Sequence, residues 1–200
     1  MKHFLHVGCG PKHKDRTTKG FDNVEWAEKR LDIDPSVFPD LVGTMTDMSA
    51  VPNASMQAVF SSHNIEHLYP HEVPVALAEF MRVLSDDGFV VITCPDLQTV
   101  CKLVAEDQLT EPAYTSPAGP IAPIDILFGH RYPMAQGNLY MSHRCGFTKK
   151  VLIATLRAVG FQSVAAMARP GYFDLWALAS KSVLEEDKLL ELAKLHFPPG

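Results

Sequence analysis

The sequence lacks any long apolar run. None of its apolar stretches approaches the roughly 18–20 residues that are needed to cross a bilayer. The segment before the first glycine turn, "MKHFLHV", is too short for a signal peptide. We therefore expect a cytoplasmic protein with no membrane partner.

Paired cysteines and basic runs are also missing. The four cysteines show no C-x-x-C spacing, which fits a reduced chain without a structural metal cluster or a disulfide framework. The formal net charge is −5, and no basic run is long enough to follow a phosphate backbone. The composition therefore argues against a nucleic-acid partner.

What the sequence does contain is an alternation of apolar strands and amphipathic helices. Hydrophobic residues make up 46% of the chain, enough for the core of one domain. The patterns predict strands at 3–7, 29–34, 40–44, 56–62, 89–95, 161–168 and 173–181, and helices at 71–84, 96–107, 148–160 and 183–196. Strands that alternate with helices favour an α/β fold with a mostly parallel sheet.

Residues 108–146 interrupt this regularity. They are rich in proline, glycine and scattered aromatics and show no sustained period. A loop of that length is usually functional, so we expect an insertion with short helical pieces that acts as a lid on the substrate side. The domain organisation that follows is one domain over 1–181, with an amphipathic helix and tail over 182–200.

Ligands of parallel sheets bind beyond the carboxyl ends of the strands, where two features of this sequence meet. Gly8 and Gly10 follow the first strand and allow a tight turn with exposed amides. Asp32 and Asp34 close the second strand. If the strand alternates regularly, both carboxylates point away from the core face that Ile33 occupies. Asp32 is the better candidate for a ribose and Asp34 for a turn cap.

The string "HNIEH" at 63–67 spells the H-x-x-E-H pattern of some zinc hydrolases, in which two histidines bind zinc and a glutamate activates water. That chemistry needs His63 and His67 on one helical face. Here His63 directly follows a strand and Pro70 stops a helix from continuing. The pattern therefore predicts no metal site.

In this order the motifs resemble the class I S-adenosylmethionine-dependent methyltransferases, in particular small bacterial members of the methyltransferase-domain superfamily. The resemblance covers most of residues 3–165 and rests on "LHVGCGP", "RLDIDP", "VFSSHNIEHL", "ALAEFMRVLSDDGFVVITCPD" and "HRCGFTKKVLIATLRAVGF". It implies a Rossmann-like three-layer sandwich with a mostly parallel seven-stranded sheet and an antiparallel last strand. The links after the first two strands are too short for full crossover helices, which we expect to be trimmed.

The resemblance also implies S-adenosylmethionine as cofactor and an unidentified small-molecule methyl acceptor, with a homodimer as one possible assembly. Its motifs assign cofactor binding to Gly8, Cys9, Gly10, Asp32, Ile33, Thr44, Asp47, Ser62 and His63. The candidate catalytic residues are His67 and His143, either of which could take a proton from the acceptor. A structural role in a turn or helix cap is the alternative for each.

Two positions depart from the family pattern. His6 stands where the family usually has an acid before the first glycine, and Thr44 replaces an acid that contacts adenine. These departures keep a second hypothesis open, a methyltransferase fold that binds without catalysing. A nicotinamide-dependent oxidoreductase is a third, although no further glycine follows Gly10 until Gly20.

The insertion holds candidate acceptor contacts. Its aromatic and methionine side chains could wall an apolar pocket or pack the insertion onto the domain: Tyr114, Phe128, Tyr132, Met134, Tyr140 and Met141. Arg131 and Arg144 could grip an acidic acceptor or serve as structural arginines.

Overall fold

A seven-stranded sheet forms the centre of the computed structural model, which describes residues 1–117 and 119–199. The strand order is β3-β2-β1-β4-β5-β9-β8, and β9 runs antiparallel to both of its neighbours, β5 and β8, while the pairs from β3 to β5 are parallel. The strands are β1 Lys2–Val7, β2 Trp26–Asp32, β3 Leu41–Val42, β4 Met56–Ser62, β5 Leu84–Pro95, β8 Ser163–Arg169 and β9 Asp174–Ser180. This architecture confirms the predicted Rossmann-like fold.

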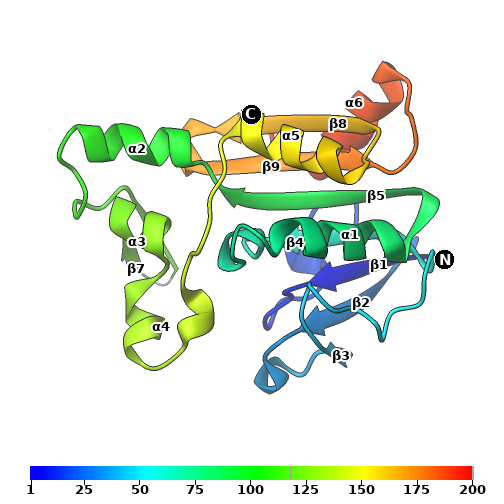
Figure 1. Cartoon of the computed structure of the whole chain (residues 1–200), viewed down its shortest axis with the longest axis horizontal. Coiled ribbons are helices and arrows are strands. Elements are labelled where there is room, and N and C mark those ends of the chain that lie inside the picture. The colour runs from blue at the N-terminus through cyan, green and yellow to red at the C-terminus, as the bar shows by residue number, and fades with distance from the viewer. Residues whose placement is uncertain (118, 200) are drawn as a thin grey trace.

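Helices cover the two faces of the sheet (Figure 1). α1 (Val73–Val83) and α5 (Lys149–Val159) pack on one face and share a core cluster with the strands. α6 (Glu186–His196) lies over the other face with an aromatic cluster. α5 begins after Thr148, whose side chain accepts from the Val151 amide, and ends at Gly160 in the left-handed region, as the sequence predicts.

The first crossover helices are trimmed, as the short links predicted. The link from β1 to β2 contains one short 3-10 turn, η1 (Lys14–Arg16), and the link from β2 to β3 contains another, η2 (Pro35–Val37). Phe21 takes the place of a helix over β1, with its ring stacked 4.3 Å from that of Phe4 and edge-on at 5.1 Å from that of Trp26. Such ring contacts let a short loop bury the sheet face.

Residues 108–146 form a small lobe next to α2 (Leu97–Ala105). It contains a hairpin of β6 (Tyr114–Ser116) and β7 (Gly119–Ile121), followed by α3 (Pro123–Phe128), α4 (Arg131–Ala135) and the turn η4 (Leu139–Met141). The hairpin was not predicted. Figure 1 shows this lobe beside the arrowhead ends of β1, β2 and β5, the edge where the fold binds ligands.

The expected alternation at the end of β2 was wrong. β2 ends at Asp32, so Ile33 lies past the strand with 44% of its side chain exposed, while Asp32 is 8% exposed. The physical cause is local, because the Asp32 carboxylate accepts hydrogen bonds from the amides of Gly10 and Asp34 and turns inward.

Among residues 1–117 and 119–199, no helix is long and apolar enough to cross a membrane.

Candidate functional site

A cavity of about 650 Å³ opens at the carboxyl ends of β1, β2 and β4. This volume lies within the usual range for sites that hold small ligands. Most of the predicted site residues line it: Gly8, Cys9, Gly10, Asp32, Ile33, Thr44, Ser62, His63 and His67. Asp47 and His143 lie outside this lining. The Asp47 carboxylate accepts from the Ser49 amide, which lowers its pKa.

The two glycines of the first turn have different roles. Both adopt a left-handed conformation, Gly8 at φ +63° and Gly10 at φ +52°. A Cβ on Gly8 would overlap the side-chain amide of Asn64. A Cβ on Gly10 would meet no described heavy atom within 4 Å. Gly8 therefore serves packing within the protein, and Gly10 leaves free space that faces the cavity.

Substituting alanine at Gly8 is expected to destabilise the folded state by about 3 kcal/mol or more, because the new methyl displaces Asn64. Gly10→Ala is the matched control, since it has the same backbone region without the clash and should cost only ~1 kcal/mol. Urea unfolding of both variants measures the difference. Equal losses of stability would show that Asn64 moves aside at little cost.

Asn64 ties the turn to the neighbouring strand. Its side-chain amide donates to the carbonyl oxygens of Val7 at 3.0 Å and Ser62 at 2.9 Å. The preceding residue, His63, adopts a left-handed φ of +54°, an uncommon conformation for a non-glycine residue. Such strain often marks a functional site. The sequence placed Asn64 in the turn after the strand, at the cofactor edge, but did not indicate that its side chain holds the glycine turn.

Asp32 connects the glycine turn to the end of β2. One carboxylate oxygen accepts from the Gly10 amide at 2.7 Å and the other from the Asp34 amide at 2.9 Å. A carboxylate has about four acceptor positions, so others stay available to a ligand in the cavity. Asp34 caps η2 by accepting from the Ser36 amide, which lowers the pKa of Asp34 and confirms its expected role.

His6, which stands where the family pattern usually has an acid, pairs with an acid from the neighbouring strand. The buried His6 ring lies with Nδ1 2.7 Å from Oε1 of Glu28. The other carboxylate oxygen of Glu28 accepts from the Lys14 amide at 3.0 Å. Phe4 pairs with Glu28 in the parallel register, which sets Glu28 diagonal to His6. The pairing of β1 with β2 was needed to recognise this.

Arg30 holds the two loops that replace the missing helices. Its side chain is buried, and its guanidinium donates to the carbonyl oxygens of Lys12 and Gly10 in one loop. The same group donates to the carbonyl oxygens of Val37 and Phe38 in the other loop. A planar guanidinium with several N–H donors suits a set of carbonyl oxygens arranged around it. Sequence reasoning missed this residue because nothing in the pattern marks a strand arginine as buried.

The Glu-His pair of the H-x-x-E-H string lies in a 3-10 turn, η3 (Ile65–His67), and not in an α-helix. Glu66 is 1% exposed, and neither of its carboxylate oxygens has a hydrogen-bond partner within the described part of the chain. Nδ1 of His63 forms an ion pair with Glu66, at 3.4 Å from Oε1. Glu66 is therefore a buried carboxylate surrounded by imidazoles.

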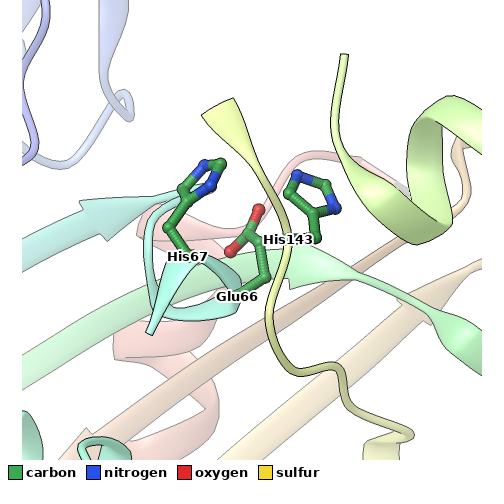
Figure 2. Close-up of side chains that lie close together, drawn as sticks. All are labelled: Glu66, His67 and His143. Atoms are coloured by element: carbon green, nitrogen blue, oxygen red, sulfur yellow. The ribbon is translucent and has the colours of Figure 1, made fainter. Parts of the chain in front are cut away.

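The two candidate catalytic histidines come together beside Glu66 (Figure 2). The ring centroids of His67 and His143 are 4.9 Å apart. His67 lies next to the segment of His143 because its Nδ1 donates to the Ser142 carbonyl at 3.0 Å. His143 in turn donates from Nδ1 to the Ile126 carbonyl at 2.8 Å. In these tautomers each Nε2 keeps a free lone pair.

Burial and neighbouring charges shift the pKa values of Glu66 and the histidines around it in opposite directions. Burial alone would raise the pKa of the Glu66 carboxyl, but the surrounding imidazoles, His63 foremost, lower it overall. Burial, which is only partial because the His63 side chain is 50% exposed, would lower the pKa of His63, but the Glu66 carboxylate outweighs this effect and raises the pKa overall. Burial lowers the pKa of His143, which favours its neutral form. The arrangement therefore favours an ionised glutamate beside a neutral imidazole.

The insertion contributes one edge of the cavity. Tyr140, Met141 and Arg144 line it, and the guanidinium of Arg144 lies 4.7 Å from the centre of the Tyr69 ring. The other candidate arginine, Arg131, instead pairs with the buried Asp125 at 2.6 Å and so stabilises the lobe. The remaining aromatic and methionine candidates lie outside the lining: Tyr114, Phe128, Tyr132 and Met134.

Comparisons with known proteins agree with this fold. Residues 5–92 match the family model described as the methyltransferase domain. A search of curated proteins finds no match. Among solved structures, the CMeT domain of the citrinin polyketide synthase is similar with a TM-score of 0.58 at 13% identity, over 90% of this chain but 46% of that one. This chain thus spans less than half of that structure.

Two further structures match over more of their length. A SAM-dependent methyltransferase from Archaeoglobus fulgidus has a TM-score of 0.57 at 14% identity, over 90% of this chain and 86% of that one. The second is the 1,6-didemethyltoxoflavin-N1-methyltransferase of Burkholderia thailandensis, which was solved with 1,6-didemethyltoxoflavin and S-adenosylhomocysteine. It has a TM-score of 0.55 at 14% identity, over 90% of this chain and 71% of that one. The fold and the match over residues 5–92 together confirm the resemblance to the class I S-adenosylmethionine-dependent methyltransferases that the sequence motifs indicated.

Proposed function

We propose that the chain transfers a methyl group from S-adenosylmethionine to a small-molecule acceptor bound in the same cavity. The observation that carries this proposal is the cavity of about 650 Å³, which gathers the glycine turn, Asp32, Thr44, Ser62 and His67 at one edge of the sheet. The fold supports it, since one structural neighbour was solved with S-adenosylhomocysteine and a small molecule.

For the cofactor, we assign the ribose hydroxyls to Asp32 and the methionine part to the turn around Gly10. Asp32 is already fixed by two backbone amides, so it can accept ribose hydroxyls without losing side-chain freedom on binding. Thr44 and the adjacent Thr46 line the cavity next to β3 and are assigned to the adenine side. Cys9, Ile33, Ser62 and His63 complete the proposed cofactor contacts.

Methyl transfer from a sulfonium is an in-line displacement, so the protein mainly has to align donor and acceptor and exclude water. The acceptor atom attacks the methyl carbon, and the bond from that carbon to sulfur breaks as S-adenosylhomocysteine leaves. Where the acceptor carries a proton, we assign its removal to His67, whose Nδ1 is held by the Ser142 carbonyl and whose Nε2 is free. His143 packs edge-on against that ring and is the second candidate.

On the acceptor side, the lobe adds groups that set which molecule fits. Tyr140 and Met141 offer an apolar wall, and Arg144 offers a cation that could pair with an acidic acceptor group. These residues come from η4 and the segment after it, so the insertion would choose the acceptor while the sheet edge holds the cofactor.

Alanine at Asp32 is expected to weaken the binding of S-adenosylhomocysteine by about 1–3 kcal/mol, or roughly 5- to 150-fold, because charge-assisted hydrogen bonds are lost. Asp34→Ala is the matched control, since that carboxylate is used by the Ser36 amide and should leave affinity nearly unchanged. Calorimetric titration measures both. The assignment of the ribose is wrong if the Asp34 variant loses affinity and the Asp32 variant does not.

The same titration separates an enzyme from a chain that has the fold alone. Binding of S-adenosylmethionine, together with release of S-adenosylhomocysteine when small hydroxyl, amine and carboxylate acceptors are supplied, would support catalysis. Binding without turnover would favour a methyltransferase fold that only binds the cofactor. No binding of either compound at millimolar concentration would overturn the proposed function.

A further inference from the structure

The Glu66 carboxylate has fewer partners than a buried charge usually has. It is 1% exposed, and both of its oxygens are without a hydrogen-bond partner among the described residues. A buried carboxylate is costly unless a cation or several donors compensate it. His63 forms an ion pair with one oxygen at 3.4 Å, but its side chain is 50% exposed, and no hydrogen-bond donor reaches either oxygen within the described residues. This partial compensation leaves room for a cation that binds at this position.

The two neighbouring imidazoles are prepared to bind such a cation. His67 and His143 each donate from Nδ1 to a backbone carbonyl, that of Ser142 and that of Ile126. Histidines that ligate a metal through one ring nitrogen usually donate from the other nitrogen to a carbonyl or carboxylate, which fixes the tautomer and the ring orientation. Both rings therefore already have the outer hydrogen bond that a metal ligand needs.

The three side chains also converge. One ligand atom from each of Glu66, His67 and His143 can be chosen so that all lie within 4.8 Å of one another. Figure 2 shows the carboxylate between the two rings in this view. Bonds of about 2.0–2.2 Å to a metal would bring such atoms to roughly 3–4 Å apart. A side-chain movement of about an ångström is enough to close the set.

Backbone hydrogen bonds hold the two segments that supply these ligands together. The Glu66 carbonyl accepts from the amides of Arg144 at 2.8 Å and Cys145 at 3.2 Å. The thiol of Cys145 also donates to the Ile65 carbonyl at 3.3 Å. The end of the insertion is thereby fastened to η3, and His143 is held near the Glu-His pair before any ion arrives. A preorganised set of this kind lowers the cost of binding.

From these contacts we infer that Glu66, His67 and His143 bind one divalent transition-metal ion, such as Zn²⁺, at the acceptor end of the cavity. Two imidazoles and one carboxylate suit zinc and its first-row neighbours better than magnesium or calcium, which prefer oxygen ligands. Three protein ligands leave a further coordination position open. His67 lines the cavity, so that position would face the acceptor and could bind its oxygen. With the ion bound, Nε2 of His67 is a ligand, so the assignment of His67 as the base applies to the metal-free chain only.

This site differs from the one that the H-x-x-E-H string suggests. In the zinc hydrolases the two histidines of the string bind the metal, whereas here His63 precedes the 3-10 turn in a left-handed conformation. Glu66 and His67 remain as ligands, and the third comes from the insertion. The prediction of no metal rested on the broken helix, a requirement that this arrangement avoids.

The experiment uses the full chain without a histidine tag, stripped with EDTA and dialysed. Calorimetric titration with zinc chloride is expected to show one equivalent bound at micromolar concentration or tighter. Cobalt chloride is expected to give visible absorption bands that saturate at the same ratio. Glu66→Gln and His143→Ala are expected to weaken zinc binding at least 100-fold. His71→Ala, which removes an exposed imidazole close in sequence, is the matched control and should bind as the unaltered chain does.

The outcomes separate this inference from its rivals. Absence of saturable zinc and cobalt binding, or equal binding by the Glu66→Gln and control variants, would overturn it and leave the His63 imidazolium as the partner of Glu66. The Glu66→Gln variant keeps the side-chain volume, and a melting temperature at or above that of the unaltered chain shows that lost binding is not unfolding. S-adenosylhomocysteine is titrated into the same samples. Its binding without zinc binding would contradict the metal site alone, and the reverse would contradict the proposed function alone.

Discussion

Valine at Gly10 is expected to abolish measurable binding of S-adenosylhomocysteine. Gly10 lines the cavity, and among the residues that the structure describes no heavy atom lies within 4 Å of its absent Cβ. The space is therefore free for a ligand, and a branched side chain would fill it. At φ +52° valine is also strained, which would disturb the amide that donates to Asp32. We expect a loss of more than 100-fold in affinity from the two effects together.

Gly160→Val is the control for the strain alone. Gly160 ends α5 at φ +118° and takes no part in the lining of the cavity. Its substitution should lower stability while leaving the affinity of the folded chain unchanged. Thermal melting gives the folded fraction of each variant, and calorimetry gives the affinity. A Gly10→Val chain that is folded and binds S-adenosylhomocysteine normally would mean that the cofactor does not lie in this cavity.

The elements of the sheet could be predicted because their signals are local. The apolar run at 89–95 and the alternation at 56–62 needed no knowledge of neighbours, and the strand at 56–62 has the predicted bounds. The trimmed crossover helices were also predictable, since a link can be measured along the chain. The pairing of β6 with β7 was missed because these three-residue strands are too short to show a periodicity.

The residues that shape the site were harder to predict because their roles depend on tertiary neighbours. Glu28 contacts His6 only because β1 and β2 pair in one particular register. Gly8 is required by the side chain of Asn64, which arrives from the end of another strand. Ile33 follows the alternation of a strand in the sequence and yet is exposed, since the hydrogen bonds of Asp32 end the strand one residue earlier.

The cluster around Glu66 has one part that the sequence shows locally and one part that depends on tertiary neighbours. The Glu-His pair is visible in the sequence, but its third member lies in the insertion, where no spacing rule connects it to the pair. Hydrogen bonds from the amides of 144 and 145 to the Glu66 carbonyl make the connection. A motif can therefore indicate the right residues while its usual geometry, here a helix, indicates the wrong partners.

Methionine at Arg30 is expected to destabilise the folded state by about 3–5 kcal/mol. The substitution keeps a long side chain but removes every donor to the four carbonyl oxygens of the loops at 10–12 and 37–38. Each of these partly buried hydrogen bonds carries its own cost when it is lost, and the loops have no α-helix to hold them in place of the guanidinium. For a chain of this size the melting midpoint should fall by roughly 10 °C or more.

Two further variants show whether the hydrogen bonds are the cause. Arg157→Met alters an exposed arginine on α5 and should shift the midpoint by no more than about 2 °C. Arg30→Lys keeps the charge but cannot reach four acceptors from one planar group, so its stability should lie between those of the unaltered chain and Arg30→Met. If the Arg30→Met and Arg157→Met variants have the same melting midpoint, water satisfies the carbonyl oxygens in place of the guanidinium, and packing holds the two loops instead. If the lysine variant restores full stability, the positive charge at this position matters more than the fan of hydrogen bonds.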